Sequence, residues 1–210
     1  MLCPMLIHDW DRPIDDDEWR AFVAANSFGH LVASGADRDV PVVVPTQFVF
    51  GTDAAGGEVR LHLARQNPIF AAIDENPRVV MSIAGDWAYI RTDWKAGAEE
   101  DPRSGIPTTY YAAVQLIGTA HVVDDAPGVA SVLAEQLADV QPDVEVVDPI
   151  EHGKQLNRIR GLLVEVTEVR AKFKYGGNLD DERKERVHHL LIERDGPGDR
   201  AAARHARRRL

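Results

Sequence analysis

The recurrence of strand-like segments is the feature that most constrains how this chain folds. Segments rich in β-branched and aromatic residues return along the sequence, and the two longest cover 108–123 and 162–175. About seven strands follow from this pattern. The strands are not regularly separated by helices, as a parallel α/β sheet requires, and neither a phosphate-cradling glycine loop nor a dinucleotide fingerprint is present. The pattern predicts a mainly β fold with appended helices (α+β), closed into a barrel.

Capping, turn and breaker residues place the other elements. Asn67 and Pro68 form a helix cap followed by proline, which is typical of a helix start. Pro41 and Pro45 lack an amide donor, so the strand that contains them is expected at an edge or a bulge of the sheet. Helices are predicted within 15–26, 69–75, 124–141 and 150–159, separate strands over 79–84 and 87–91, and a solvent-facing loop over 95–105.

The length of 210 residues and the hydrophobic content of 44% suit one sizeable domain with helical additions. We expect a single barrel domain to cover 1–193. The remaining segment, 194–210, holds six arginines and two aspartates among Gly, Pro and Ala. Such a composition predicts a poorly ordered, solvated tail, with a weak contact to a polyanion as the alternative.

Net charge and cysteine content limit the partners and the cellular compartment that can be expected. The net charge of −10 and the pI near 5.2 argue against a surface that binds nucleic acid, so direct DNA binding is not expected. Cys3 is the only cysteine, which excludes an internal disulfide and fits a reducing compartment. The sequence has no apolar run of about 18 residues and no signal-peptide pattern near Met1. We expect a cytoplasmic protein that does not contact a membrane.

Polar residues that could carry chemistry gather first at 62–67. His62, Arg65 and Asn67 lie where a predicted strand meets the start of a helix, and such a junction can hold an anion or a cofactor. The alternative is equally open. His62 would then be a core histidine whose hydrogen bonds are satisfied, and Arg65 would be the partner in a surface ion pair.

Two further clusters lie at the ends of the longest strands. Lys172 and Lys174 share one face of the last strand, and two neighbouring cations repel each other unless an anion such as a flavin phosphate lies between them. Thr108, Thr109 and Tyr111 supply hydroxyl groups and a ring that could flank a flat ligand. Packing alone also explains each of these residue types in strands. The eight histidines form no metal-binding pattern, and no serine-nucleophile motif is present.

Four motifs in this order resemble one known family. They are HLARQNP at 62–68, GDWAYI at 85–90, IPTTYYAAVQLIG at 106–118 and RAKFKYGGN at 170–178. The chain resembles the PaiB-like family of FMN-binding negative transcriptional regulators, in particular its actinobacterial branch, from about Met5 to Leu191. The resemblance implies a split β-barrel of the flavin-reductase or pyridoxamine-phosphate-oxidase type. It also implies a homodimer that binds FMN and a small-molecule ligand at the subunit interface.

The resemblance assigns the cofactor site residue by residue. It implies contacts from His62, Arg65, Asn67, Thr108, Tyr111, Lys172 and Lys174, and the hydroxyl of the neighbouring Thr109 completes the candidate site. The chain departs from the family in having Thr109 and Tyr110 where tryptophan and asparagine are usual. It also lacks the serine and basic residue that other flavin-binding split barrels place near 67–69 for the phosphate.

These departures keep a second cofactor open. The related piperazate synthases use haem on the same scaffold, and His62 is the residue we would expect as axial ligand if haem b were bound. Three functions follow as alternatives. They are a flavin-dependent oxidoreductase of a small molecule, a haem-binding enzyme, and a transcription-linked regulator that acts through DNA or a partner protein.

Overall fold

The chain packs as two compact units, each assembled from separate segments of the sequence. The computed structural model describes residues 5–51, 56–97 and 99–210. Unit 1 consists of Met1–Phe22, Ala84–Val114 and Ala171–Leu210, and unit 2 consists of Val23–Ile83 and Gln115–Arg170. Three long strands contribute residues to both units. The single domain expected over 1–193 stays a prediction.

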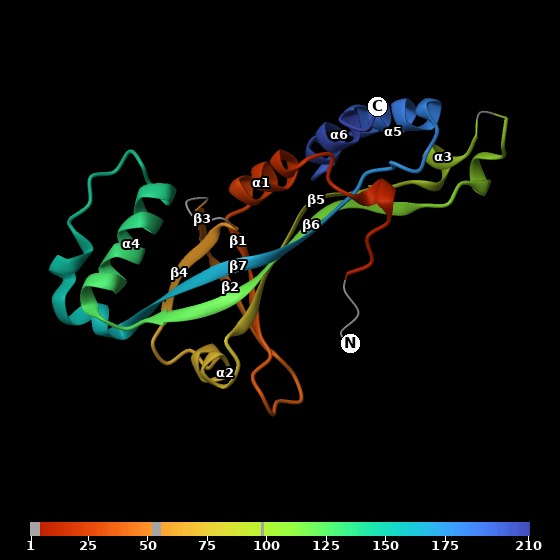
Figure 1. Cartoon of the computed structure of the whole chain (residues 1–210). Coiled ribbons are helices and arrows are strands. Elements are labelled where there is room, and N and C mark those ends of the chain that lie inside the picture. Colours follow the sequence, from red (N-terminus) through yellow and green to blue (C-terminus); the bar gives the residue numbers. More distant parts are fainter. Residues whose placement is uncertain (1–4, 52–55, 98) are drawn as a thin grey trace. The chain divides into compact units, whose positions relative to one another are not determined.

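The described residues form one seven-stranded sheet in the order β2-β1-β5-β6-β7-β4-β3, whose strands can be followed by colour in Figure 1. The predicted mainly β fold with appended helices is therefore confirmed. The strands are β1 (Phe28–Ala33), β2 (Val42–Gln47), β3 (Val49–Gly51), β4 (Glu58–Ala64), β5 (Arg78–Ile90), β6 (Thr108–Val123) and β7 (Ile159–Lys174).

The strand pairs within unit 2 are antiparallel. In β1 and β2, His30 lies opposite Pro45, and β2 is the last strand at its end of the sheet. The missing amide of Pro45 therefore breaks no ladder in the interior of the sheet, as predicted. In β4 and β7, His62 lies opposite Gly161. Val59, Leu61 and Leu63 of β4 are buried and His62 is only half-buried, so His62 points to the opposite face of β4 from these three residues.

The helices cap and connect the strands. They are α1 (Asp16–Ala25), α2 (Ile69–Glu75), α3 (Thr92–Lys95), α4 (Ala126–Val140), α5 (Asp181–Arg194) and α6 (Asp199–Arg207), with 3₁₀ helices η1 (Asp9–Asp11), η2 (Pro102–Ser104) and η3 (Pro149–Arg158). In unit 2, α4 contacts β4 and η3, and in unit 1, α5 contacts α3 and α6. None of the described helices has both the length and the apolar character that crossing a membrane requires.

The strands predicted over 79–84 and 87–91 are one continuous strand, β5. The glycine and aspartate between them resemble a turn in the sequence. In the structure Asp86 adopts a φ of 50° within the strand, a left-handed conformation that aspartate tolerates better than most residues. The hydroxyl of Tyr175 donates a hydrogen bond of 2.9 Å to the carbonyl oxygen of Asp86. This contact holds the irregular backbone where the sequence suggested a break.

The segment 194–210, predicted to be a disordered tail, is folded. Asp195 ends α5 with a φ of 47°, and α6 follows with three buried alanines on one face. Arg194 is paired with Asp199, whose side chain is only 1% exposed, and Arg209 is paired with Glu18. The composition suggested disorder because it gives the number of arginines but not the acidic residues with which they pair. Ion pairs and small residues that pack against the rest of unit 1 stabilise the folded segment.

Candidate functional site

Unit 1 contains a pocket of about 260 Å³ at the ends of β6 and β7. Its lining combines cationic, hydroxyl and aromatic groups, contributed by the N-terminal segment, α3, β6, and β7 with the turn that follows it. The residues on which the following argument depends are Trp10, Asp11, Lys95, Thr108, Tyr110 and Lys174. A small polar concavity with converging cations is the feature of unit 1 best suited to bind an anionic ligand.

Lys174 and Thr108 form the polar centre of this pocket. Lys174 is the last residue of β7 and Thr108 is the first of β6. The Lys174 ammonium donates a hydrogen bond of 2.6 Å to Thr108 Oγ1. Because this bond uses a lone pair of the hydroxyl oxygen, the hydroxyl hydrogen of Thr108 is available to donate to another acceptor. Thr109 follows on β6 and is half-buried.

Lys172 is close to the same site but already has partners within unit 1. Its ammonium donates a 2.8 Å hydrogen bond to the Leu6 carbonyl oxygen and lies 3.8 Å from Asp11 Oδ2. Both Lys172 and Asp11 are buried. A buried charge keeps a partner because an unpaired one is costly to remove from water. Lys172 therefore fastens the N-terminal segment to β7.

The ring of Tyr111 lies beside both lysines of β7. The Lys172 and Lys174 ammonium nitrogens are 5.8 and 5.9 Å from its centroid. Cations at this distance from a ring face are stabilised by the negative electrostatic potential of the π system. Four residues that the sequence analysis selected, Thr108, Tyr111, Lys172 and Lys174, are thus neighbours in unit 1.

Sequence reasoning missed Lys95, the third cation near this pocket. The segment around it was predicted to be a solvent-facing loop, but Lys95 ends the short helix α3 and is half-buried. Burial lowers the pKa of Lys95, and the nearby charges of Lys174 and Arg183 lower it further. The signal that could have revealed this was Trp94, a large apolar residue directly before the predicted loop, which is buried in the structure.

Two glycines after β7 allow the pocket wall to close tightly. Gly176 has a φ of +78°, and a Cβ there would collide with the hydroxyl of Tyr110. A Cβ on Gly177 would collide with the carbonyl oxygen of Trp10. The ring of Tyr110 packs edge-on against Tyr175, with centroids 5.8 Å apart, and burial raises its pKa. These glycines are required because the backbone passes where a side chain has no room.

The segment at 62–67 belongs to unit 2, where each selected residue has a structural contact. His62 Nδ1 lies 2.6 Å from Gln136 Oε1. The Arg65 guanidinium donates hydrogen bonds to the carbonyl oxygens of Asn157 and Ile159 and to Asp124. Asn67 Oδ1 accepts a hydrogen bond of 3.1 Å from the amide of Ile69, at the start of α2. A common cofactor site for these residues and the lysines of unit 1 stays a prediction.

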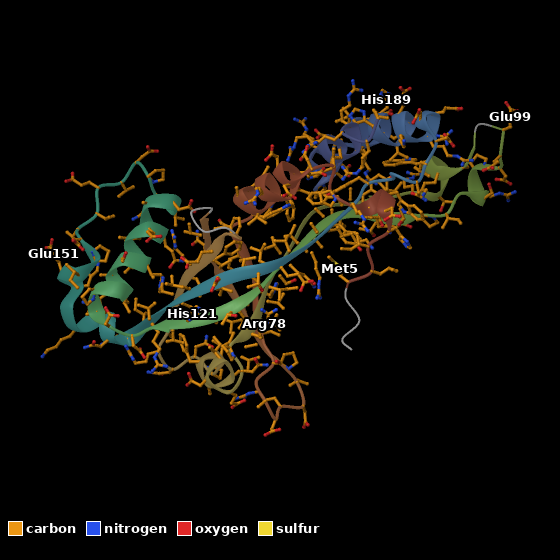
Figure 2. The ribbon with its side chains drawn as sticks, in the orientation of Figure 1. Met5, Arg78, Glu99, His121, Glu151 and His189 are labelled. Carbon is orange, nitrogen blue, oxygen red and sulfur yellow. The ribbon has the colours of Figure 1, made fainter. Side chains whose placement is uncertain are left out.

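The described residues contain no group of three or more histidine, cysteine, aspartate and glutamate side chains that could hold a metal ion. His188 and His189 are adjacent on α5, and His189 is exposed on its outer side (Figure 2). Neighbouring positions on a helix point in different directions, so the two rings do not face each other.

Comparison with known proteins places the chain in a family. Residues 5–168 match the family described as "Putative FMN-binding domain". The chain belongs to this family. The match ends before Lys172 and Lys174. Among curated proteins, none matches this chain significantly.

Several solved structures share the fold at low sequence identity. The flavocytochrome Anf3 from Azotobacter vinelandii is 21% identical, with a TM-score of 0.59 over 81% of this chain and 72% of that one. The FAD and heme binding protein from Mycobacterium smegmatis is 15% identical, with a TM-score of 0.58 over 78% and 73%. A "putative 5-nitroimidazole antibiotic resistance protein" from Bacteroides thetaiotaomicron is 12% identical, with a TM-score of 0.55 over 76% and 84%. With the seven-stranded sheet, these likenesses confirm the split-barrel fold of FMN-binding type.

Proposed function

We propose that this protein binds FMN and that the pocket of unit 1 holds the anionic end of the cofactor. The observation that carries the proposal is the Lys174–Thr108 contact of 2.6 Å inside a pocket with a second lysine in its wall. An ammonium and a hydroxyl are suitable partners for phosphate oxygens. Tyr111, beside Lys174, adds a ring for contact with a flat group. Membership of the FMN-binding family supports the choice of ligand.

The pocket is large enough for only part of an FMN molecule. Its volume of about 260 Å³ lies below the roughly 300–1,000 Å³ of pockets that enclose a whole drug-sized ligand. We propose that a second copy of the chain completes the site in a homodimer. Trp87 and Tyr89 support this, since they alternate with buried residues on β5 and are 60% and 49% exposed. Exposed aromatic side chains of this kind are enriched at protein interfaces.

A bound flavin would supply redox chemistry, so the proposed activity is that of a flavin-dependent oxidoreductase of a small molecule. The residues of this chain would bind and orient the cofactor. Lys174 and Thr108 would hold its anionic end, and Lys172 would keep the N-terminal segment in place through Leu6 and Asp11.

Absorption spectroscopy of the purified protein tests FMN binding. We expect the two-band spectrum of oxidised flavin, or its appearance when FMN is added to colourless protein. Lys174→Met should weaken FMN binding by about 10- to 100-fold, since it removes a charged hydrogen-bond donor. Lys154→Gln is the matched control, because Lys154 is exposed in unit 2. A protein that takes up no FMN would exclude the proposal.

Haem b is a second candidate, and the environment of His62 favours it. Gln136 Nε2 lies 3.4 Å from the carbonyl oxygen of Gln47, which orients the amide so that its oxygen accepts from His62 Nδ1. A neutral His62 would then carry its lone pair on Nε2. Metal-binding histidines are commonly fixed in this way by a hydrogen bond to the other ring nitrogen. The names of the proteins from A. vinelandii and M. smegmatis include a cytochrome and haem.

Reconstitution with haem b separates the two candidates. If His62 is the axial ligand, the protein should show one intense Soret band that changes shape in His62→Ala. Gln136→Leu should shift the band less, because it removes only the orienting hydrogen bond. A Soret band that is the same in the parent protein and in His62→Ala would exclude His62 as the ligand.

A further inference from the structure

The charges of unit 1 are unevenly paired. Lys172 is close to Asp11, Lys184 is paired with Asp181, and Arg183 is paired with Glu100 and Asp180. Among the described residues, neither Lys95 nor Lys174 has a carboxylate partner, although the chain as a whole carries ten more acidic than basic side chains. The two unpaired ammonium groups line the same pocket.

This arrangement is unfavourable without an anion. Lys95 is half-buried, and the ammonium of Lys174 is near enough to lower its pKa. Like charges that are partly removed from water repel each other, and a ligand that carries negative charge relieves both the repulsion and the loss of hydration. The carboxylate of Asp11, which also lines the pocket, does not supply that charge because it lies beside the Lys172 ammonium.

The hydroxyl of Thr108 adds a third group of suitable chemistry. It accepts from Lys174, so its hydrogen can be donated to an oxygen of the ligand. A phosphate monoester carries about −1.5 to −2 charges at pH 7 and offers three acceptor oxygens. Two ammonium groups and one hydroxyl match this number of oxygens and this charge better than they match a single carboxylate.

We infer that Lys95 and Lys174 flank a phosphate-monoester subsite, with Thr108 as the third contact, and that Lys95 makes the protein prefer a phosphorylated ligand to the same ligand without phosphate. The inference deepens the proposed function and rests on it for the choice of FMN as the ligand. It assigns the contact to Lys95 and Lys174, where the sequence alone suggested the pair Lys172 and Lys174.

The test compares FMN with riboflavin, which lacks only the phosphate, by fluorescence titration of the purified chain. In Lys95→Gln we expect FMN affinity to fall by about 10- to 100-fold and riboflavin affinity to change by less than about twofold. Lys95→Arg, which keeps the charge, should retain most of the FMN affinity, and Lys154→Gln should leave both affinities unchanged. Equal losses for FMN and riboflavin, or no loss for either, would overturn the inference.

Calorimetric titration with inorganic phosphate provides a readout that does not depend on flavin. Phosphate should bind the parent protein and bind Lys95→Gln more weakly, while far-UV circular dichroism shows that the variant is folded. Phosphate binding that depends on Lys95 in a protein that takes up no FMN would support the subsite and reject FMN as the ligand. FMN binding that Lys95→Gln does not weaken would support FMN and reject the subsite. Binding of neither ligand would reject both.

Discussion

The imidazole of His205 stacks on the ring of Tyr175, with centroids 4.6 Å apart and planes inclined by 18°. His205 Nε2 lies 2.8 Å from Asp86 Oδ2, and His205 Nδ1 lies 3.5 Å from Glu18 Oε1. Both ring nitrogens thus face carboxylates, and both contacts are attractive only when each nitrogen carries a proton. Tyr175 follows Lys174 in the chain. α6 is therefore docked through a histidine that packs on the neighbour of a residue that lines the pocket.

The stability of unit 1 should fall as the pH rises from 6 to 9. Burial lowers the pKa of His205, but its hydrogen bonds to Asp86 and Glu18 outweigh burial and raise the pKa above its ordinary 6.5. A raised folded-state pKa gives stability that is complete below 6.5 and is lost as pH rises through the folded-state value. Thermal unfolding across this range should show a falling Tm, and His205→Asn should flatten the dependence. A Tm that rises over the same range in the parent protein would contradict this role.

Glu18→Gln should destabilise the protein by about 3–5 kcal/mol, because it leaves Arg209 without its buried partner. The Glu18 side chain is fully buried and accepts hydrogen bonds from Arg209 at 2.9 and 3.0 Å. Urea unfolding measures the loss, and Asp17→Asn is the control because Asp17 is an exposed neighbour on α1. Similar effects of the two substitutions would show that the buried pair contributes nothing specific.

The Glu18 carboxylate also sets the lower end of the pH range in which the protein is most stable. Burial raises the pKa of Glu18, but hydrogen bonds from His205, Arg209 and the Ile14 amide outweigh burial and lower it from 4.5 to about 2. A lowered folded-state pKa gives stability that is present above 4.5 and is lost as pH falls toward 2. For these two groups together, stability should be greatest between pH 4.5 and 6.5. A Glu18→Gln protein should lose less stability between pH 4.5 and 2 than the parent protein loses.

Gly176→Ala should cost more stability than Gly153→Ala. Both glycines have positive φ, +78° and +55°, so alanine is strained at either position. A Cβ at 176 also meets the Tyr110 hydroxyl, whereas a Cβ at 153 meets nothing within 4 Å and Gly153 is exposed. Urea unfolding should show the larger loss for Gly176→Ala, because the collision adds roughly 1–3 kcal/mol inside a packed turn and the exposed backbone at 153 has space to relax. Equal losses in the two variants would contradict the prediction.

Removal of residues 196–210 should destabilise unit 1 and not merely shorten a solvated tail. The deletion removes α6, the His205 contacts and the Arg209 pair with Glu18. Hydrogen exchange should become faster in the first turns of α1 and in the last residues of β7. Unchanged exchange in both segments would show that α6 does not stabilise them.

Local patterns predicted those elements whose defining residues are neighbours in the sequence. The strand 108–123 matches β6 at both ends, and the cap at Asn67 and Pro68 predicted α2 with its observed bounds. The sequence did not predict that Lys95 is half-buried or that arginines of 194–210 form ion pairs. Both features depend on residues that are distant in the sequence. Lys95 depends on Lys174, and Arg209 depends on Glu18. Pairing of this kind leaves no trace in composition or periodicity.

The assembly of each unit from separate segments has a consequence during protein synthesis. Unit 2 needs nothing beyond Arg170, whereas unit 1 needs Ala171–Leu210 in addition to its two earlier segments. At about 5–20 residues per second, the ribosome needs some seconds more to deliver that last segment. Unit 2 can thus complete its contacts before Asp11 and Glu18 of unit 1 meet their partners Lys172, His205 and Arg209. The cationic pocket then forms after unit 2.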